Sequence, residues 1–144
     1  MNRKAVRLGL SRTRFVDSTG LHPDNLSTAH ELAMLVNAAY EYPLIRQYST
    51  MASHPISLPG RRSAVLSYRN SNRLVTDERW SIGLSKTGYI REAGRCLVMQ
   101  ATIAARPVVI VLLNAPGKKA RTTDAARLKT WLEGLGYPEY TKAL

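Results

Sequence analysis

The chain has 144 residues, 44% of them hydrophobic and 7% aromatic, which is the composition of one globular domain and excludes a disordered segment. Its formal net charge of +11, from 21 basic and 10 acidic residues, favours a polyanionic neighbourhood such as nucleic acid, an anionic membrane surface or an acidic wall polymer. No stretch approaches the roughly 20 apolar residues that a membrane span requires. The single cysteine, Cys96, excludes an internal disulfide and a cysteine-based metal site, and its apolar surroundings predict a small core residue.

Helices and loops are predicted for the first part of the chain. Residues 2–10 form a short basic helix that ends at Gly9. Its charges are not followed by the apolar run of a signal peptide, so the sequence as written predicts no export and a cytoplasmic location. Thr28 and Glu31 fit a capping box that starts a second helix, with Ser27 as an alternative cap, and Tyr42-Pro43 ends the helix. The apolar residues of this helix recur at helical spacing: Leu32, Leu35, Val36, Ala39 and Tyr40.

The segment from Ile45 to Asp77 has a weaker pattern and predicts mostly irregular structure, because prolines and glycine interrupt it. Arg69-Asn70-Ser71-Asn72 is predicted to be a turn that leads to Leu74-Val75. Three strands follow in close succession: Trp80–Thr87, Arg95–Ala104 and Val108–Leu113. The tight connection Ala105-Arg106-Pro107 predicts that the last two strands pair as an antiparallel hairpin.

A final helix is predicted to begin near Thr123-Asp124, with Asp124 as a helix cap, and to end over Gly134, Gly136 and Pro138. Its predicted core face consists of Leu128, Trp131, Leu132 and Leu135.

These elements predict an α+β fold, with an antiparallel sheet of about three strands, a packed C-terminal helix and an N-terminal region of helices and loops. The whole chain, 1–144, is predicted to be one domain. Its helical and loop part covers 1–79, and its strands and terminal helix cover 80–136. A sheet with so few strands leaves at least one edge unpaired.

The first predicted strand leads into Lys86-Thr87-Gly88, a tripeptide suited to gripping an anion. Lysine supplies a point charge and threonine a short hydroxyl donor, while glycine lets a ligand lie directly against the backbone. Within this strand ordinary polar alternation accounts for Ser85, which is therefore not predicted to be a nucleophile. The alternating residues are Trp80, Ile82 and Leu84 on one face and Ser81, Gly83 and Ser85 on the other.

Lys-Thr-Gly is one of the signature elements of penicillin-binding proteins and serine β-lactamases, and eight segments of this chain occur in the same order in that group. They are Met1-Asn2-Arg3-Lys4-Ala5 with Leu8-Gly9-Leu10, Phe15-Val16-Asp17-Ser18-Thr19-Gly20-Leu21, Ser27-Thr28-Ala29 with Glu31-Leu32, Tyr42-Pro43-Leu44-Ile45, Arg69-Asn70-Ser71-Asn72 with Leu74-Val75, Lys86-Thr87-Gly88-Tyr89, Ala93-Gly94-Arg95-Cys96-Leu97-Val98, and the helix with Asp124-Ala125 and Trp131. The chain therefore resembles the C-terminal part of the low-molecular-mass penicillin-binding proteins, the D-alanyl-D-alanine carboxypeptidases and endopeptidases. The resemblance covers nearly the whole chain and implies an incomplete β-lactamase/transpeptidase-like domain.

Two further motifs of that family are missing from these 144 residues. The family uses Ser-x-x-Lys for the acylated serine and Ser-x-Asn for further polar groups of the site. No serine here has a lysine three positions later, and no Ser-x-Asn occurs. Tyr68-Arg69-Asn70 imitates a Tyr-x-Asn variant but is predicted to be a turn. No catalytic residue is therefore assigned, so the chain alone is expected to be inactive. A truncated gene product or a start site assigned too far downstream would account for the difference.

The resemblance implies substrate-binding roles for Lys86, Thr87, Gly88 and Tyr89. Lys86 and Thr87 would bind the terminal carboxylate of a peptidoglycan peptide or of a β-lactam, Gly88 would let substrate lie along the strand, and the Tyr89 N–H would be one oxyanion-hole donor. It further implies an acyl-serine mechanism without a metal or cofactor, and a periplasmic location for the complete enzyme.

Two other functions stay open at this point. The first is a basic nucleic-acid-binding domain that uses clusters such as Arg61-Arg62 and Lys118-Lys119. Charge is its only support, because the chain lacks a helix-turn-helix pair, an RNA-recognition motif and zinc spacing, so the sequence disfavours nucleic acid. The second is a pseudoenzyme that binds wall peptides without cleaving them. The three histidines, His22, His30 and His54, lack metal-ligand spacing and are predicted to be surface or loop residues.

Overall fold

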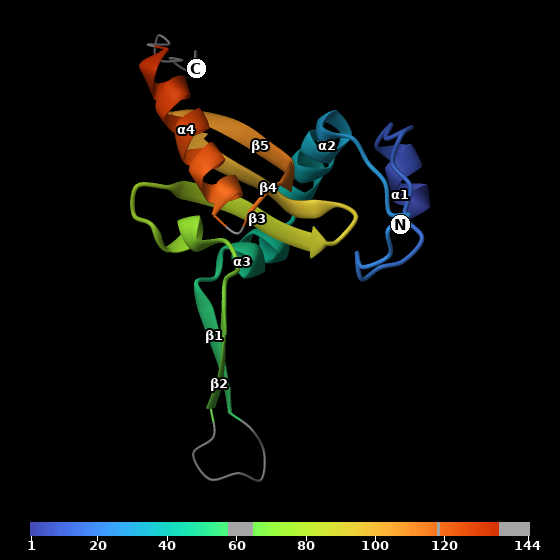
Figure 1. Cartoon of the computed structure of the whole chain (residues 1–144), viewed down its shortest axis with the longest axis horizontal. Helices are drawn as coiled ribbons and strands as arrows, with labels where there is room; N and C mark the ends of the chain where they lie inside the picture. The colour runs from blue at the N-terminus through green and yellow to red at the C-terminus, as the bar shows by residue number, and fades with distance from the viewer. Residues whose placement is uncertain (58–64, 118, 136–144) are drawn as a thin grey trace.

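The computed structural model describes residues 1–57, 65–117 and 119–135. Helices come first along the chain, strands follow, and a helix comes after the last strand; the colours of Figure 1 follow this order. The helices are α1 (Asn2–Arg7), α2 (Ala29–Tyr40), α3 (Pro43–Thr50), the 3₁₀ turn η1 (Arg73–Thr76) and α4 (Ala120–Gly134), and the strands are β1 (Ser53–Ser57), β2 (Val65–Arg69), β3 (Ser81–Ile90), β4 (Gly94–Ile103) and β5 (Arg106–Ala115). The predicted α+β class is confirmed.

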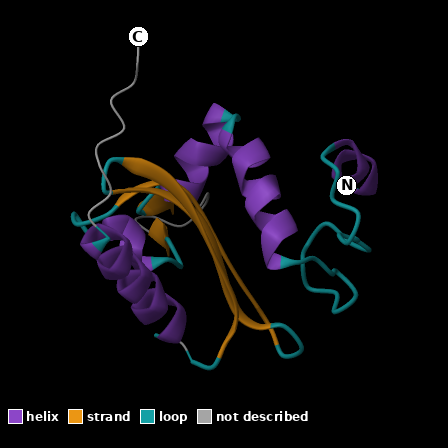
Figure 2. Ribbon diagram, turned by 90° about the horizontal axis from the view of Figure 1, so that it is seen from above, coloured by secondary structure: helices purple, strands orange, loops and turns teal. Residues whose placement is uncertain are grey.

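A three-stranded antiparallel sheet, ordered β3-β4-β5, forms the centre of the fold. Helix α4 covers one of its faces, while α2 and α3 lie on the other (Figure 2). The three predicted strands are confirmed with shifted bounds: β3 and β5 extend beyond the predicted ranges, and β4 lies one residue earlier. β4 and β5 pair as the predicted hairpin, although Arg106 and Pro107 belong to β5 rather than to the connection.

The main core lies between the sheet and α4, where alternate residues of β4 point toward the helix. Leu97, Met99 and Ala101 are fully buried, and Ile103 is buried nearly as well. These side chains pack with Ala125 of α4 in one hydrophobic cluster. Period-two alternation on the central strand therefore sets which face of the sheet receives the helix.

A β-bulge at Gly83 reverses the sheet face to which each later residue of β3 points. Ile82 pairs with Ala101, but Leu84 pairs with Gln100 instead of Met99. The predicted alternation of Ile82 and Leu84 on one face is therefore wrong, because one extra residue on β3 turns the rest of the strand over. A Cβ at Gly83 would collide with the side chains of Gln100 and Tyr40, which explains the glycine at this position.

The bulge has a direct consequence for the polar residues that follow. Ser85 opposes Met99 and is buried, rather than pointing to solvent as the alternation predicted. Thr87 lies on the same sheet face as Ser85, and Lys86 lies on the opposite face.

Helix α4 begins earlier than predicted. It starts at Ala120 with Lys119 as the N-cap residue, which makes no side-chain capping bond. The predicted cap Asp124 instead lies inside the helix and forms a salt bridge of 3.4 Å with Arg127. The N-terminal end of α4 therefore has no capping side chain. Gly136, Pro138 and Lys118 lie outside the described residues.

The predicted core face of α4 is only partly correct. Leu132 packs against the core cluster together with the unpredicted Ala125. Trp131 is 60% exposed, and Leu128 and Leu135 are exposed as well. A small residue at position 125 lets the helix approach the sheet closely.

The segment from Ile45 to Asp77, predicted to be mostly irregular, contains regular structure. Helix α3 follows α2 with Pro43 at its first position, where a missing N–H costs nothing. Strands β1 and β2 form a separate antiparallel hairpin that projects from the body (Figure 1). Every residue of both strands is exposed, so no buried face was available to give the sequence a strand pattern. Arg61 and Arg62 lie outside the described residues.

The N-terminal segment is held to α2 by a buried carboxylate. The Thr28 side chain caps α2 by accepting from the Glu31 N–H at 3.2 Å, which confirms half of the predicted capping box. The Glu31 carboxylate does not return to the cap. It accepts from the Arg12 N–H at 2.8 Å and from the Thr13 hydroxyl at 2.5 Å, and it thereby ties the loop after α1 to the body.

Candidate anion-binding site

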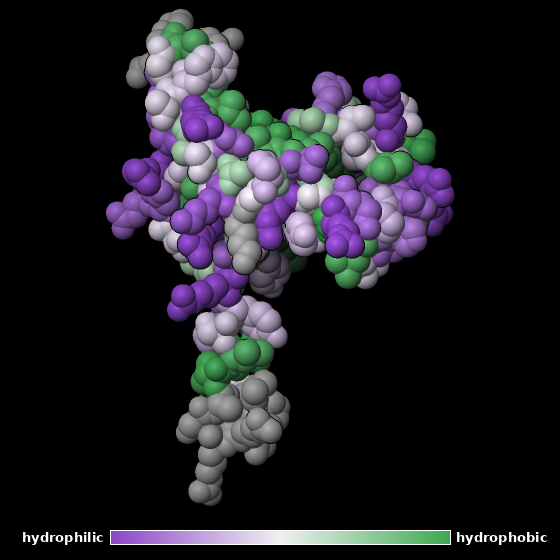
Figure 3. All heavy atoms as spheres, in the orientation of Figure 1, coloured by the Kyte–Doolittle hydropathy of each residue, from purple (hydrophilic) through white to green (hydrophobic). Residues whose placement is uncertain are grey.

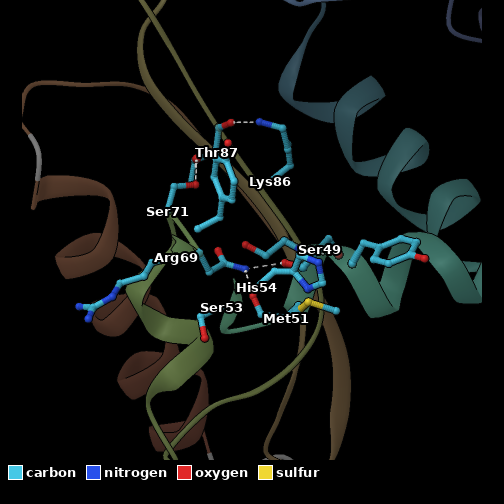
Figure 4. Close-up of a pocket in the computed structure, with 12 residues that line it drawn as sticks. Ser49, Met51, Ser53, His54, Arg69, Ser71, Lys86 and Thr87 are labelled. Carbon is cyan, nitrogen blue, oxygen red and sulfur yellow. Dashed lines mark hydrogen bonds between the residues drawn. The ribbon is translucent and has the colours of Figure 1, made fainter. Parts of the chain in front are cut away.

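A pocket of about 300 Å³ lies where β3, α3 and the base of the β1–β2 hairpin meet. Figure 4 shows Lys86, Thr87 and Ser71 together at one end of it, with Ser49, Met51 and His54 at the other. The pocket is lined by Tyr48, Ser49, Met51, Ser53, His54, Tyr68, Arg69, Asn70, Ser71, Ser85, Lys86 and Thr87. It brings the predicted Lys86 and Thr87 together with a segment that the sequence left as irregular.

The charge of the lining residues suits an anionic ligand. Lys86 and Arg69 are cationic, and none of the lining residues is acidic. The Lys86 ammonium donates to the Thr87 carbonyl oxygen, which places the charge beside the strand that carries the threonine. A ligand carboxylate here would meet a lysine and several hydroxyls, and would find no competing carboxylate.

Two predicted site residues follow Thr87. Gly88 leaves the backbone open, whereas the side chain of Tyr89 does not line the pocket. Apart from the two chain neighbours of Gly88, no atom of the described residues lies within 4 Å of the point where a Cβ would stand, so the backbone there is open. The Tyr89 side chain is 57% exposed and does not line the pocket; the Arg95 guanidinium lies 4.4 Å from its ring centre. Any part that Tyr89 plays in this site would therefore come from its backbone rather than its ring.

Two asparagines hold the turn before η1 against the pocket. The Asn70 amide donates to the carbonyls of Ser49 and Met51, at 3.0 Å each, so it fastens the turn to the end of α3. Because that amide is occupied by backbone carbonyls, Asn70 acts as a structural residue although it lines the pocket beside Tyr68.

Asn72 makes the second attachment. It is 1% exposed, its amide donates to the Ser85 hydroxyl at 2.9 Å, and its carbonyl oxygen accepts from the Leu74 N–H. The Ser85 N–H donates in turn to the Ser49 hydroxyl at 3.2 Å. Strand β3 is thus bonded to both α3 and the turn just before Lys86, and this fixes where the lysine and threonine lie.

Ser71, between the two asparagines, is the contact that sequence reasoning missed. Its hydroxyl oxygen lies 2.6 Å from the Thr87 hydroxyl oxygen. The only signal in the sequence is the turn Arg69-Asn70-Ser71-Asn72 itself, which is one of the eight segments that resemble the family. Nothing in its spacing shows that it lies beside a strand 16 residues later.

The other candidate residues lie outside the core, as far as the structure describes them. His22, His30 and His54 are exposed, as predicted, although His54 lies on β1 and lines the pocket. Among the described residues no group of His, Cys, Asp and Glu is arranged to hold a metal ion. Cys96 is half-buried at the start of β4 rather than a core residue, and its thiol points toward the Ala93 carbonyl at 3.5 Å.

None of the described helices combines the length and the apolar character that crossing a bilayer would demand.

Solved structures place the fold in a known class. The Streptomyces K15 DD-transpeptidase superimposes on 94% of this chain with a TM-score of 0.77 and 26% identity, and the match covers 52% of that protein. A D-alanyl-D-alanine carboxypeptidase from Mycobacterium tuberculosis has the same fold over 96% of the chain, with a TM-score of 0.73 and 22% identity. The sheet with its flanking helices is therefore part of a DD-transpeptidase fold.

Sequence comparison gives the family. Residues 1–117 match the model of the D-alanyl-D-alanine carboxypeptidase family. D-alanyl-D-alanine endopeptidases from Pseudomonas aeruginosa and Escherichia coli are each 44% identical over 133 residues, 92% of this chain. The chain belongs to the D-alanyl-D-alanine carboxypeptidase family, and the resemblance of the eight segments is confirmed. It spans 43% of the length of these two curated relatives.

Proposed function

We propose that this chain supplies the carboxylate-binding wall of a serine peptidase that acts on D-alanyl-D-alanine peptides of peptidoglycan. The observation that carries the proposal is the pocket in which Lys86 and Thr87 lie beside an open backbone at Gly88, with no acidic residue among its lining. Family membership and the two endopeptidase relatives support the choice of substrate.

In this site Lys86 provides the charge that attracts the terminal carboxylate, and the Thr87 hydroxyl donates a hydrogen bond to it. Hydrogen bonds to a charged partner contribute about 1.5–3 kcal/mol each, more than neutral ones. Gly88 allows the peptide backbone to lie against β3, and the Tyr89 N–H serves as one donor of an oxyanion hole. A β-lactam carboxylate would occupy the same position as the peptide carboxylate.

These 144 residues alone are expected to form no acyl-enzyme. They contain neither Ser-x-x-Lys nor Ser-x-Asn, so no serine is paired with a lysine in the manner that the family requires. Two serines that line the pocket take part in hydrogen bonds within the chain: the Ser85 hydroxyl accepts from Asn72, and the Ser49 hydroxyl accepts from the Ser85 N–H. Cleavage would require a nucleophile from residues outside this sequence, and the work of the complete enzyme would be in the periplasm, where its substrate is.

Binding and acylation can be tested separately. We expect a short peptide ending in D-alanyl-D-alanine to bind the chain, and Lys86→Ala to weaken that binding tenfold or more, because a charge-assisted contact of 1.4 kcal/mol corresponds to about a factor of ten. Lys119→Ala, which removes an exposed lysine from the end of α4, is the matched control and should change nothing. Equal affinity of both variants would overturn the proposed site.

Incubation with a fluorescent penicillin tests the second part. No covalent label should remain after denaturation. A stable adduct would show that some serine of this chain is a working nucleophile, and the assignment of binding without acylation would be wrong.

A further inference from the structure

The Ser71 and Thr87 hydroxyls line the same pocket and also lie within hydrogen-bond distance of each other. Their oxygens are 2.6 Å apart, at the short end of the range for an O–H···O hydrogen bond. Each hydroxyl has one proton to donate, so the bond between them uses one proton and leaves one free, whichever residue is the donor. The pair therefore offers one directed donor to a ligand in the pocket.

A carboxylate beside Thr87 fixes the direction of that bond. An ionised carboxylate only accepts hydrogen bonds, so the Thr87 proton must point to it. Ser71 then donates to the Thr87 oxygen. Hydrogen bonds arranged in series in this way polarise and strengthen one another.

We propose that Ser71 is a positioning residue for substrate binding, which orients and polarises the Thr87 hydroxyl toward the peptide carboxylate. This inference rests on the function proposed above and adds a residue from outside the Lys-Thr-Gly strand to it. The two hydroxyls form a coupled pair, so neither one has its full effect without the other.

The surroundings of Ser71 support a fixed rather than an incidental contact. Asn70 on one side is bonded to the end of α3, and Asn72 on the other is bonded to Ser85 of β3. The turn is therefore attached on both sides of Ser71, by Asn70 to the end of α3 and by Asn72 to the strand that carries Thr87. An exposed hydroxyl on a free loop would lose side-chain entropy to reach such a position, whereas this one is held there by the backbone.

The experiment compares two ligands on the full 144-residue chain: a short peptide ending in D-alanyl-D-alanine and the same peptide with a C-terminal carboxamide, both titrated by NMR. Ser71→Ala should weaken binding of the carboxylate peptide about fivefold to tenfold, the size of one lost hydrogen bond. Binding of the carboxamide should change less than twofold, because its own N–H can donate to the Thr87 oxygen that Ser71 vacates.

Three further variants distinguish positioning from general damage. Ser71→Thr keeps the hydroxyl and should restore most of the carboxylate affinity. Thr87→Val removes the acceptor, so Ser71→Ala should have no further effect in that background, which a double-mutant cycle measures. Ser67→Ala, an exposed serine of β2 that does not line the pocket, is the matched control.

Three other outcomes would overturn the inference, and they show whether the proposed function fails with it. If Ser71→Ala has no effect while Lys86→Ala and Thr87→Val weaken binding, the hydroxyl pair is wrong and the proposed function stands. If Ser71→Ala weakens both ligands equally and Ser71→Thr does not restore binding, Ser71 is only structural. If the unaltered chain binds neither ligand, or Lys86→Ala and Thr87→Val leave binding unchanged, the proposed function fails together with the inference.

Discussion

Two regions of this molecule differ in how far their side chains are buried. The β3–β5 sheet with α4 contains the main buried cluster, which consists of apolar side chains from consecutive elements. The region from α3 to η1 has an exposed hairpin and contributes only Leu74 of η1 to that cluster. Side-chain hydrogen bonds of Ser49 and Asn72 attach it to β3. The sheet region gives the fold its stability, whereas the second region gives the pocket its shape. Three changes in these regions and one in the N-terminal segment are expected to have effects of decreasing size.

Removal of a core leucine should distinguish the regions most strongly. Leu97→Ala creates a cavity beneath α4 and should lower the free energy of unfolding by about 2–5 kcal/mol. Leu66→Ala, in the hairpin strand β2, removes a side chain that is 44% exposed and should cost well under 1 kcal/mol. Chemical denaturation of both variants measures the difference. Similar losses would mean that the hairpin belongs to the core.

Asn72 links the two regions, so its removal should have an intermediate effect. Asn72→Ala leaves the Ser85 hydroxyl and the Leu74 N–H without their partner and should cost about 1–3 kcal/mol. It should also weaken peptide binding, since β3 loses an attachment just before Lys86. Asn37→Ala, at an exposed position of α2, is the control for stability. If Asn72→Ala melts like the unaltered chain, this attachment does not hold the strand.

Glu31 makes stability depend on pH in a third part of the molecule, the N-terminal segment. Burial alone would raise the pKa of Glu31, but hydrogen bonds from Thr13, the Arg12 N–H and Ser11 outweigh it and lower the pKa below the ordinary 4.5. A lowered pKa in the folded state stabilises the fold at pH above 4.5, and this contribution is lost as the pH falls through the folded value.

Melting temperatures from pH 7 to pH 3 test that dependence. Glu31→Gln should lower the melting temperature at pH 7 and should weaken its fall in acid, whereas the exposed Glu78→Gln should leave the pH profile unchanged. An unaltered acid profile in Glu31→Gln would show that this carboxylate does not control the attachment.

The smallest effect is expected in the turn between β4 and β5. There a substitution should stabilise the fold, whereas the substitutions above destabilise it. Ala104 and Ala105 have φ of 49° and 58°, the left-handed region that a two-residue hairpin loop requires and that costs an alanine energy. Ala105→Gly should therefore stabilise the chain by about 0.5–1 kcal/mol. This figure is the relief of backbone strain minus the larger conformational entropy that a glycine loses on folding. Ala126→Gly, the same substitution inside α4, should destabilise by a similar amount. Thermal unfolding compares the two, and a destabilised Ala105→Gly would contradict the turn geometry.

The same two regions explain how much of the structure the sequence could predict. Burial of Leu97, Met99 and Ala101 repeats every second residue, so the strands and their pairing followed from the pattern. The hairpin has no buried face, and the bulge at Gly83 adds a single residue that no periodicity shows. Both features escaped prediction for that reason.

The residues of the candidate site likewise fall into those that the sequence predicts and those that it does not. Lys86, Thr87 and Gly88 were found because they are consecutive and match a motif. Ser71 and Ser49 reach the pocket from segments 15 or more residues away, through single hydrogen bonds that depend on the folded arrangement. The position of Asp124 inside α4, rather than at its cap, also depends on where β5 ends. Local patterns predict elements, whereas contacts between distant polar residues require the fold.

The most direct test of the central claim is a titration of the labelled chain with a peptide ending in D-alanyl-D-alanine, followed at the backbone amides of Thr87, Gly88 and Tyr89. We expect these signals to shift in a saturable way, the carboxylate peptide to bind more tightly than its carboxamide, and Lys86→Ala to remove this preference. Shifts confined to other parts of the chain, or equal binding of the two peptides, would contradict it.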